Sequence, residues 1–352
     1  MMGWRRSVVT AGRAVEARFD LLKFRLKRRT GRLGPIKVLP YRGHGNSRNL
    51  FMKGRVLEGK GITRSSGSDS VGTNLRNMVR RFASDEIPFA RVRARFAGHV
   101  LEAVADEEGF FDLCFELVAS PDPGTTWHPV EVELLWPAEG AGARAIGSVL
   151  IPTGARFGVI SDLDDTVVRS SVTNFSKMVR IAFLNNAHTR LPFEGVASFY
   201  RALQRGAGRE FNPIFYVSNG PWNLYDLLED FLDIHELPAG PLFLRDWSPT
   251  TVRSPAEHKL DIIRTLLAVY PKLPFILIGD SGEKDPEIYH QAVRGHPGRI
   301  RAIYIREVTT KGRDAAVHAI AREVRSLGAE MLLVPDTATA AEHAAQEGFI
   351  AS

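Results

Sequence analysis

Three carboxylates follow an apolar segment near the middle of the chain. Residues 157–160 (FGVI) are typical of a buried strand in a parallel sheet, and residues 161–166 then read SDLDDT. Like charges a few Å apart repel one another unless a cation or shared protons neutralise them. Asp162 and Asp164 are two residues apart, so in an extended chain they point to the same side, while Asp165 points elsewhere. A divalent cation on Asp162 would place that carboxylate to attack a phosphorus atom, with Asp164 close enough to exchange a proton with the leaving group.

A single Asp at this position would be an ordinary turn residue, because Asp and Thr are common after strands. The pattern D-x-D-x-T directly after an apolar segment favours a reactive site instead. The residues alone do not decide which carboxylate is the nucleophile and which is the acid.

A second apolar segment, Ile214 to Val217, ends in Ser218, Asn219 and Gly220. A small hydroxyl next to a glycine that permits close backbone approach suits the binding of a phosphate oxygen. The same three residues also make an ordinary turn, so by themselves they do not distinguish a phosphate-binding site from a turn.

Lys259 and two further aspartates complete the set. Lys259 is near the start of a predicted helix, where an ammonium gains nothing from the helix dipole, so it requires an anionic partner or full solvation. A third apolar segment ends at 279–285 in GDSGEKD, where Asp280 and Asp285 offer hard oxygen ligands for Mg²⁺. Asp285 is also a candidate N-cap, with Pro286 as the first helical residue.

These residues come from a region, residues 152–352, in which predicted strands and helices alternate. This alternation predicts a doubly wound parallel α/β sheet, in which ligands bind at the carboxyl ends of the strands. The predicted strands are 158–161, 214–218, 275–279, 300–305 and 331–334. The predicted helices are 175–184, 196–203, 224–232, 257–269, 285–293, 314–327 and 339–347.

Residues 34–151 have a different pattern, in which apolar and polar residues alternate with period two. This pattern predicts an antiparallel β-sandwich without a cluster of catalytic residue types, interrupted by one helix at 74–82. The predicted strands are 36–39, 50–57, 90–96, 100–104, 111–117, 130–134 and 148–151.

Residues 1–33 predict a basic amphipathic helix. Its first 32 residues hold ten Lys or Arg against two acidic residues, a net charge of +8, whereas the whole chain has +6, so the remainder carries −2. One interpretation is a helix lying on an anionic membrane surface, and the other is a helix whose apolar face packs on the protein. Nucleic acid is not expected as a partner, because no binding module accompanies the helix.

Other features of the sequence indicate the cellular compartment of the protein. Cys114 is the only cysteine, which excludes an internal disulfide and fits a reducing compartment. No apolar run approaches the roughly 20 residues of a membrane span, and early arginines interrupt any signal-peptide core. We therefore expect a cytoplasmic protein, peripheral at a membrane.

The order of the candidate motifs along the chain is Asp pair, Ser, Lys, Asp. Receiver-type phosphorylation domains use similar residues, but their lysine comes last. The observed order resembles the haloacid dehalogenase-like (HAD) phosphatases. The segments SDLDDTVVRSSVTN, FYVSNGPWNLYDLLEDFL, GPLFLRDW and IGDSGEKDPEIY further resemble the App1-type phosphatidate phosphatase family, and IKVLPYRGHGNSRNLFMKGRVLEG resembles its N-terminal β region. Asn219 and Gly220 depart from the more serine-rich stretch expected there, which bears on substrate preference.

The resemblance implies a HAD-like (Rossmannoid) fold and a Mg²⁺-dependent phosphatase that forms an aspartyl-phosphate. It implies Asp162 as nucleophile and Asp164 as general acid and base. The implied phosphate-binding residues are Thr166, Ser218, Asn219 and Lys259. The implied magnesium site comprises Asp162, Asp164, Asp280 and Asp285.

The expected reaction is hydrolysis of phosphatidate to diacylglycerol. Two alternatives stay open, a phosphatase of a soluble or protein-bound phosphomonoester and a catalytically silent, membrane-associated adaptor. The predicted apolar helix at 175–184 would flank an open site with little cap, which suits a bulky substrate.

Overall fold

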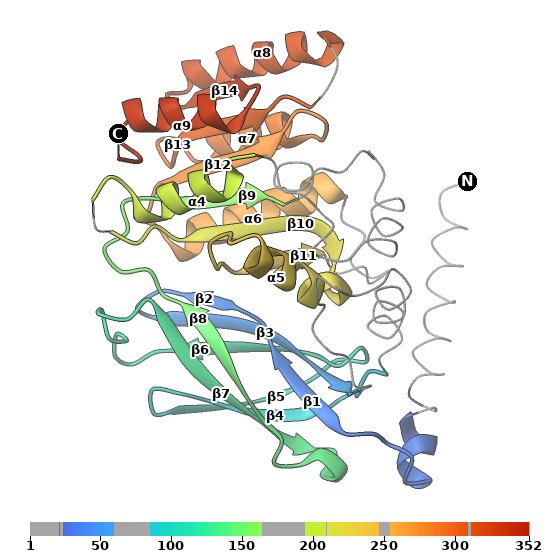
Figure 1. Ribbon diagram of the computed structural model, residues 1–352. Helices are drawn as coiled ribbons and strands as arrows, with labels where there is room; N and C mark the ends of the chain where they lie inside the picture. Colours follow the sequence, from blue (N-terminus) through green and yellow to red (C-terminus); the bar gives the residue numbers. More distant parts are fainter. Residues whose placement is uncertain are drawn as a thin grey trace. The chain divides into compact units, whose positions relative to one another are not determined.

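The computed structural model describes residues 21, 24–59, 85–163, 194–208, 210–245, 254–308 and 311–351 (Figure 1). They form two compact units, one from the residues before Pro152 and one from the residues that follow. The first contains a mostly antiparallel sheet and the second an all-parallel sheet with helices, so the predicted α/β class is confirmed. The predicted helices at 74–82 and 175–184 and residues 1–20 of the predicted basic helix lie outside the described residues.

The described residues of the N-terminal unit form eight strands. They are β1 (Ile36–Pro40), β2 (Gly43–Gly45), β3 (Asn49–Glu58), β4 (Arg91–Phe96), β5 (His99–Val104), β6 (Phe110–Glu116), β7 (Trp127–Trp136) and β8 (Arg144–Leu150). Their order is β1-β3-β2-β8-β7-β4-β5, and β6 pairs with β3. Among the described strands of this unit, β2 and β8 form the single parallel pair, which makes the sheet mixed where the sequence predicted purely antiparallel pairing.

Period-two alternation explains the core of this unit. Every second residue of the longer strands is buried, and these residues belong to one apolar cluster drawn from β3, β4, β6 and β7. Two parts of the sheet therefore pack face to face over a common core, as in a sandwich. The members from β6 and β7 are Phe111, Leu113, Phe115, Val130, Val132 and Leu134.

The described end of the basic helix packs on this unit. Residues 24–29 are helical, and Phe24 is only 5% exposed, with its ring edge against Trp136. Lys27 makes ion pairs with Glu58 and Asp85. Arg28 Nε donates to Glu139 Oε1 at 2.7 Å and its guanidinium lies over the Trp136 ring. The last described turns of this helix are therefore docked, as the second interpretation of residues 1–33 predicts.

The described residues of the C-terminal unit include six parallel strands. They are β9 (Gly158–Asp162), β10 (Ile214–Pro221), β11 (Leu242–Arg245), β12 (Phe275–Asp280), β13 (Ile300–Arg306) and β14 (Glu330–Val334). The helices are α4 (Val196–Arg205), α5 (Tyr225–Ile234), α6 (Pro255–Val269), α7 (Asp285–Gly295), α8 (Lys311–Ser326) and α9 (Thr337–Gln346). No described helix is both long and apolar enough to cross a membrane.

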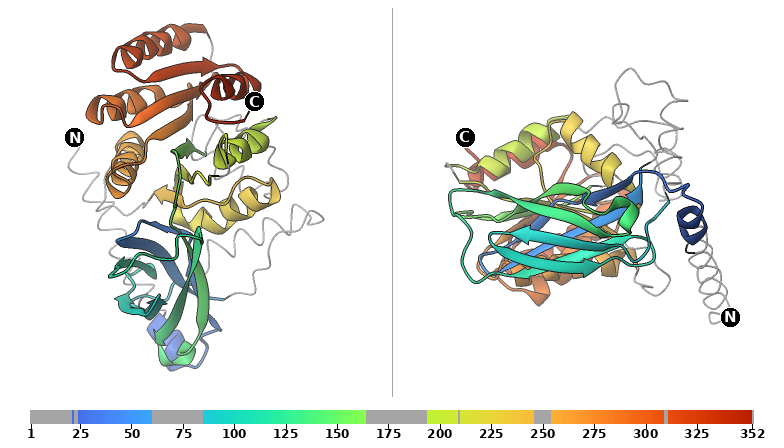
Figure 2. Two further views of the ribbon diagram at one scale, coloured as in Figure 1. Left: turned by 90° about the vertical axis from the view of Figure 1, so that its left-hand side faces the viewer. Right: turned by 90° about the horizontal axis from the view of Figure 1, so that it is seen from below.

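The strand order is β11-β10-β9-β12-β13-β14. From β9 the chain moves outward to β10 and β11, then returns to β12 and moves outward in the other direction. Helices α4, α5 and α9 cover one face of the sheet and α6, α7 and α8 cover the other (Figure 2). The connections therefore change face between β9 and β12, which is the position where ligands bind in such sheets.

Candidate active site

Two aspartates end the two strands that flank this switch point. Asp162 is the last residue of β9 and Asp280 is the last residue of β12. The strands are parallel neighbours in which Ile278 pairs with Ser161, so both carboxylates lie at the same edge of the sheet. Both side chains are buried. Burying two carboxylates together is costly, so the arrangement requires compensating positive charge.

The turn from β12 to α7 is wrapped around these carboxylates. Gly282 N and Glu283 N donate to Asp280 Oδ1 at 2.6 and 2.9 Å, and Asp280 N donates to Asp285 Oδ2 at 3.2 Å. A Cβ at Gly279 would lie 2.3 Å from Asp285 Oδ2, so this close approach requires glycine. Asp285 is the first residue of α7 and the N-cap is Lys284, so Asp285 does not cap the helix.

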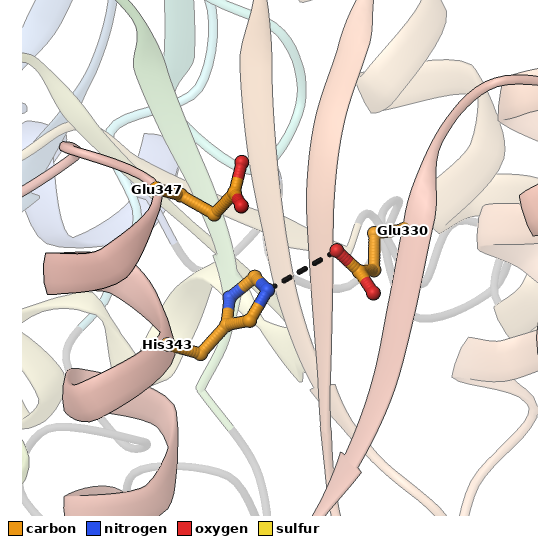
Figure 3. A group of neighbouring side chains, drawn as sticks. All are labelled: Glu330, His343 and Glu347. Carbon is orange, nitrogen blue, oxygen red and sulfur yellow. Dashed lines mark hydrogen bonds and ion pairs between the residues drawn. The ribbon is translucent and has the colours of Figure 1, made fainter.

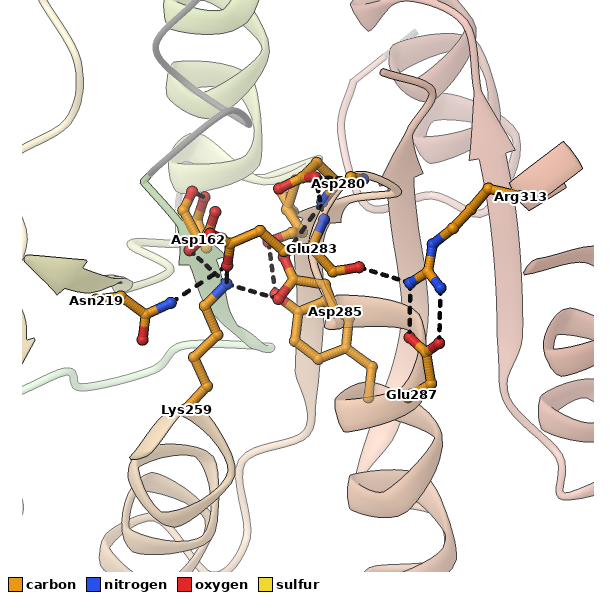
Figure 4. Close-up of polar contacts among 12 residues, drawn as sticks. Asp162, Asn219, Lys259, Asp280, Glu283, Asp285, Glu287 and Arg313 are labelled. Carbon is orange, nitrogen blue, oxygen red and sulfur yellow. Dashed lines mark hydrogen bonds and ion pairs between the residues drawn. The ribbon is translucent and has the colours of Figure 1, made fainter. Parts of the chain in front are cut away.

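Lys259 brings positive charge from the facing helix, α6. A capping box starts this helix, with Glu257 N donating to Ser254 Oγ at 3.2 Å and Ser254 N donating to Glu257 Oε2 at 2.6 Å. The Lys259 side chain is 2% exposed, and its Nζ lies 2.8 Å from Asp162 Oδ1, 2.6 Å from Asp285 Oδ1 and 2.9 Å from Glu283 Oε2 (Figure 4). The contact with Asp162 is an ion pair whose angles do not make a hydrogen bond.

The charge of Lys259 depends on these neighbours. Burial by itself would lower the pKa of the Lys259 ammonium, but Asp162, Asp285 and Glu283 outweigh it and hold that pKa well above its ordinary value. The lysine is therefore a fixed cation in the site, as an anion-binding group must be.

The three aspartates have the properties of a cation site. One carboxylate oxygen from each of Asp162, Asp280 and Asp285 lies within 4.8 Å of the other two. Asp280 Oδ2 is buried and has no hydrogen-bond partner among the described residues. Burial and the nearby Asp285 raise the pKa of Asp280 to about 7, and burial raises that of Asp285. An unpartnered buried oxygen within a cluster of carboxylates fits a hard divalent cation such as Mg²⁺.

Ser218 and Asn219 come from the strand on the other side of β9. Val217 pairs with Asp162, so Ser218 lies one residue beyond that level on β10. Gly220 N donates to Ser218 Oγ at 3.0 Å, and Asn219 Nδ2 donates to Glu283 Oε2 at 3.2 Å. The turn that was one interpretation of Ser218, Asn219 and Gly220 is not formed, because β10 continues to Pro221, with a shift in its pairing to β11 after Val217.

The structure thus brings together six of the eight predicted site residues: Asp162, Ser218, Asn219, Lys259, Asp280 and Asp285. Asp164 and Thr166 lie outside the described residues. Sequence analysis missed Glu283, whose carboxylate joins Lys259 to Asn219. The signal was present in GDSGEKD, but an acidic residue in a turn gives no indication of a buried lysine partner.

Arg313 of α8 is a second residue that was missed. Its guanidinium donates to Ser281 O at 2.9 Å and to Glu283 O at 2.6 Å, and it forms two 3.0 Å bonds to the Glu287 carboxylate. It therefore fixes the turn between β12 and α7 from outside. No local pattern in the sequence connects a helical arginine with a turn about thirty residues earlier.

A second group of side chains of metal-binding types lies at the start of strand β14 and at the end of helix α9 (Figure 3). Glu330, at the start of β14, and His343 and Glu347 each place one ligand atom within 4.8 Å of the others. His343 Nε2 lies 3.1 Å from Glu330 Oε2, and its Nδ1 lies 3.0 Å from the Tyr304 hydroxyl. Both ring nitrogens therefore have protein partners, and these contacts explain His343 as a structural residue.

Comparisons with known proteins agree on the region that holds the site. Residues 157–307 match the family model for the catalytic domain of phosphatidate phosphatase APP1. Phosphatidate phosphatase APP1 of Saccharomyces cerevisiae is 36% identical over 166 residues, which are 46% of this chain and 27% of that protein. An uncharacterized protein of Schizosaccharomyces pombe is 29% identical over 154 residues, 43% of this chain and 25% of that protein.

The chain thus covers about a quarter of the length of these curated relatives. Among solved structures, DsGPDH of Dunaliella salina is 21% identical with a TM-score of 0.30, over 46% of this chain and 33% of that one, and the fold described above does not depend on this likeness. The predicted resemblance to an App1-type catalytic domain is confirmed for residues 157–307, which contain all six gathered site residues.

Proposed function

We propose that the chain, whose residues 157–307 match the family model for the catalytic domain of phosphatidate phosphatase APP1, hydrolyses a phosphomonoester, with phosphatidate as substrate and diacylglycerol and inorganic phosphate as products. The observation that carries the proposal is the buried group of Asp162, Asp280 and Asp285 around Lys259. Fixed carboxylates beside a fixed cation are what phosphoryl transfer through an aspartyl-phosphate requires.

In the first step an oxygen of Asp162 forms a bond to phosphorus, and the bond from phosphorus to the diacylglycerol oxygen breaks. Asp164 gives that oxygen its proton. In the second step Asp164 takes a proton from water, and the water oxygen attacks the aspartyl-phosphate. Inorganic phosphate leaves and the Asp162 carboxylate is restored. The roles of both aspartates follow the family resemblance.

The remaining residues position the phosphoryl group. Lys259, Ser218 and Asn219 come from two elements on either side of Asp162, and together with Thr166 they would hold the non-reacting oxygens. Mg²⁺ held by Asp162, Asp164 and Asp280, with Asp285 behind them, would neutralise charge on the transferred group. Positioning and electrostatic stabilisation account for most catalysis of this kind.

The buried lysine also argues against the silent-adaptor alternative. A lysine and three aspartates removed from water are expensive to bury, and a domain without a reaction to catalyse gains nothing specific from them. A soluble or protein-bound phosphomonoester fits the same carboxylates equally well, so the substrate has to be decided by experiment.

The test is phosphate release by the purified protein with Mg²⁺, measured on phosphatidate in mixed micelles and on a panel of soluble phosphomonoesters. We expect release from phosphatidate well above that from the soluble panel. Release from soluble esters alone would favour the soluble-substrate alternative, and no release from any of them would favour the adaptor.

We further propose that the basic helix binds the anionic membrane surface that carries the substrate. Docking uses Lys27 and Arg28, whereas Arg25, Arg29 and Arg32 are exposed on the same segment. Each Lys or Arg near an anionic surface contributes about 1 kcal/mol at most. Three exposed arginines next to a docked turn are therefore enough for reversible attraction, provided that the turn stays docked.

We expect replacement of Arg25, Arg29 and Arg32 by Gln to weaken binding to phosphatidate-containing vesicles by roughly tenfold or more. Binding is measured by co-sedimentation, with neutral vesicles as reference, and it should weaken further as salt rises. Replacement of the exposed Arg264, Arg294 and Arg301 by Gln removes the same charge elsewhere and is the matched control. If both variants bind equally, the membrane contact does not involve this segment.

A further inference from the structure

Three carboxylates surround the Lys259 ammonium. Nζ donates hydrogen bonds to Glu283 Oε2 at 2.9 Å and to Asp285 Oδ1 at 2.6 Å, and it lies 2.8 Å from Asp162 Oδ1 in an ion pair. These anions already occupy positions around the ammonium that a phosphate oxygen would take. Substrate phosphate therefore gains full access to Lys259 when one of the carboxylates moves away.

Exposure identifies that carboxylate. The side chains of Asp162 and Asp285 are completely buried, and Asp285 also accepts from Asp280 N. The side chain of Glu283 is 36% exposed, so its carboxylate has solvent to move into. Among these three carboxylates, Glu283 is the one that leaves Lys259 at the lowest cost.

One oxygen of Glu283 also receives a second donor of the site. Asn219 Nδ2 lies 3.2 Å from Glu283 Oε2, the same atom that lies 2.9 Å from Lys259 Nζ (Figure 4). Lys259 and Asn219 are two of the groups that would hold substrate phosphate. A negatively charged oxygen between an ammonium and an amide N–H is bound as a phosphate oxygen would be.

The backbone of Glu283 has partners of its own, separate from those of its side chain. Its N–H donates to Asp280 Oδ1 at 2.9 Å, and its carbonyl accepts from Arg313 Nη2 at 2.6 Å. Rotation of the side chain about its own bonds would therefore carry the carboxylate out without moving the turn that holds Asp280 and Asp285. These contacts keep the turn in place in both positions of the side chain.

We propose that the Glu283 carboxylate is an internal occupant of the phosphate site, which substrate phosphate displaces from Lys259 and Asn219. The inference rests on the proposed function for the identity of the displacing group. It predicts that Glu283 competes with phosphate for the two donors, so removing its charge strengthens phosphate binding. If Glu283 only oriented Lys259, its replacement would weaken phosphate binding, because the lysine would be less well placed.

The test compares the full-length protein with Glu283→Gln and Glu283→Ala, in the presence of Mg²⁺. Inorganic phosphate is titrated by calorimetry and also assayed as a competitive inhibitor of phosphatidate hydrolysis. Both variants should bind inorganic phosphate roughly tenfold more tightly than the wild type, with a lower KM. Glu323→Gln removes the same charge at an exposed position on α8 and should leave phosphate binding unchanged.

Unchanged or weaker phosphate binding in both Glu283 variants would overturn the proposal, as would a lower kcat with KM unchanged or raised. The calorimetric measurement does not require turnover. Tighter phosphate binding in a protein that hydrolyses no phosphomonoester would retain the internal occupant and reject the proposed function. If the wild type hydrolyses phosphatidate but the variants bind phosphate no more tightly, the proposed function is retained and the internal occupant is rejected.

Discussion

Asp162→Asn is expected to abolish phosphate release in a protein that stays folded. The amide has nearly the shape of the carboxylate but cannot form the bond to phosphorus that makes the aspartyl-phosphate. Loss of a covalent nucleophile lowers kcat by on the order of 10⁴-fold or more, because positioning and electrostatics alone leave only residual catalysis. No other single substitution proposed here has a larger expected effect.

The fold should tolerate this change for a reason specific to the site. Breaking one buried ion pair usually leaves an uncompensated charge, but Lys259 retains Asp285 and Glu283 as partners. At the same time one of three crowded aspartates becomes neutral, which relieves repulsion. The two effects oppose each other, so we expect the free energy of unfolding to change by about 1–2 kcal/mol at most.

The measurements are phosphate release, thermal unfolding and covalent phosphate on acid-quenched protein. Asp162→Asn should show neither turnover nor covalent phosphate, whereas Asp164→Asn should turn over slowly and still acquire covalent phosphate. This contrast assigns nucleophile and acid, which the residues alone leave open. Asp112→Asn, at a position 76% exposed, is the charge-matched control and should behave as the wild type. Turnover near the wild-type rate in Asp162→Asn would reject it as the nucleophile.

The elements that sequence analysis identified were those with strong apolar periodicity. β2 was missed because its three residues, Gly-His-Gly, carry no apolar signal. β11 was missed because its four residues, Leu242–Arg245, are too few to show a period. Both strands form through pairing with longer neighbours, so their cause lies in tertiary structure and not in local sequence.

The site was predictable to the extent that parallel strands align their carboxyl ends. Asp162, Ser218 and Asp280 each follow an apolar strand, and the topology brings such positions together. The partners of Lys259 and the contacts of Arg313 were not predictable, because they join residues from different elements through side chains. The sequence left open whether Lys259 has an anionic partner or is solvated, and it did not identify the carboxylates that surround this lysine in the structure.

The last prediction concerns metal and pH together. Turnover should vanish in excess chelator and return with Mg²⁺ but not with Ca²⁺, because the larger ion accepts looser geometry and misplaces the reacting groups. Asp280 Oδ2 has no hydrogen-bond partner among the described residues. Mg²⁺ would bind this oxygen in the folded state only, so it should also raise the unfolding temperature. Asp280→Asn should lose both effects.

The raised pKa of Asp280 sets the sign of the pH dependence. Its pKa in the folded protein is about 7 against an ordinary value of 3.8, so between these values the folded state holds a proton that the unfolded state has lost. The free energy of unfolding without metal should therefore fall as pH rises from about 4 to about 7. Mg²⁺ competes with that proton, so the rise in unfolding temperature that it causes should grow from about pH 5.5 to about pH 8. Thermal unfolding in chelator and in Mg²⁺ across this range measures both slopes, and a magnesium shift that is independent of pH would show that Asp280 is not a ligand that must lose its proton.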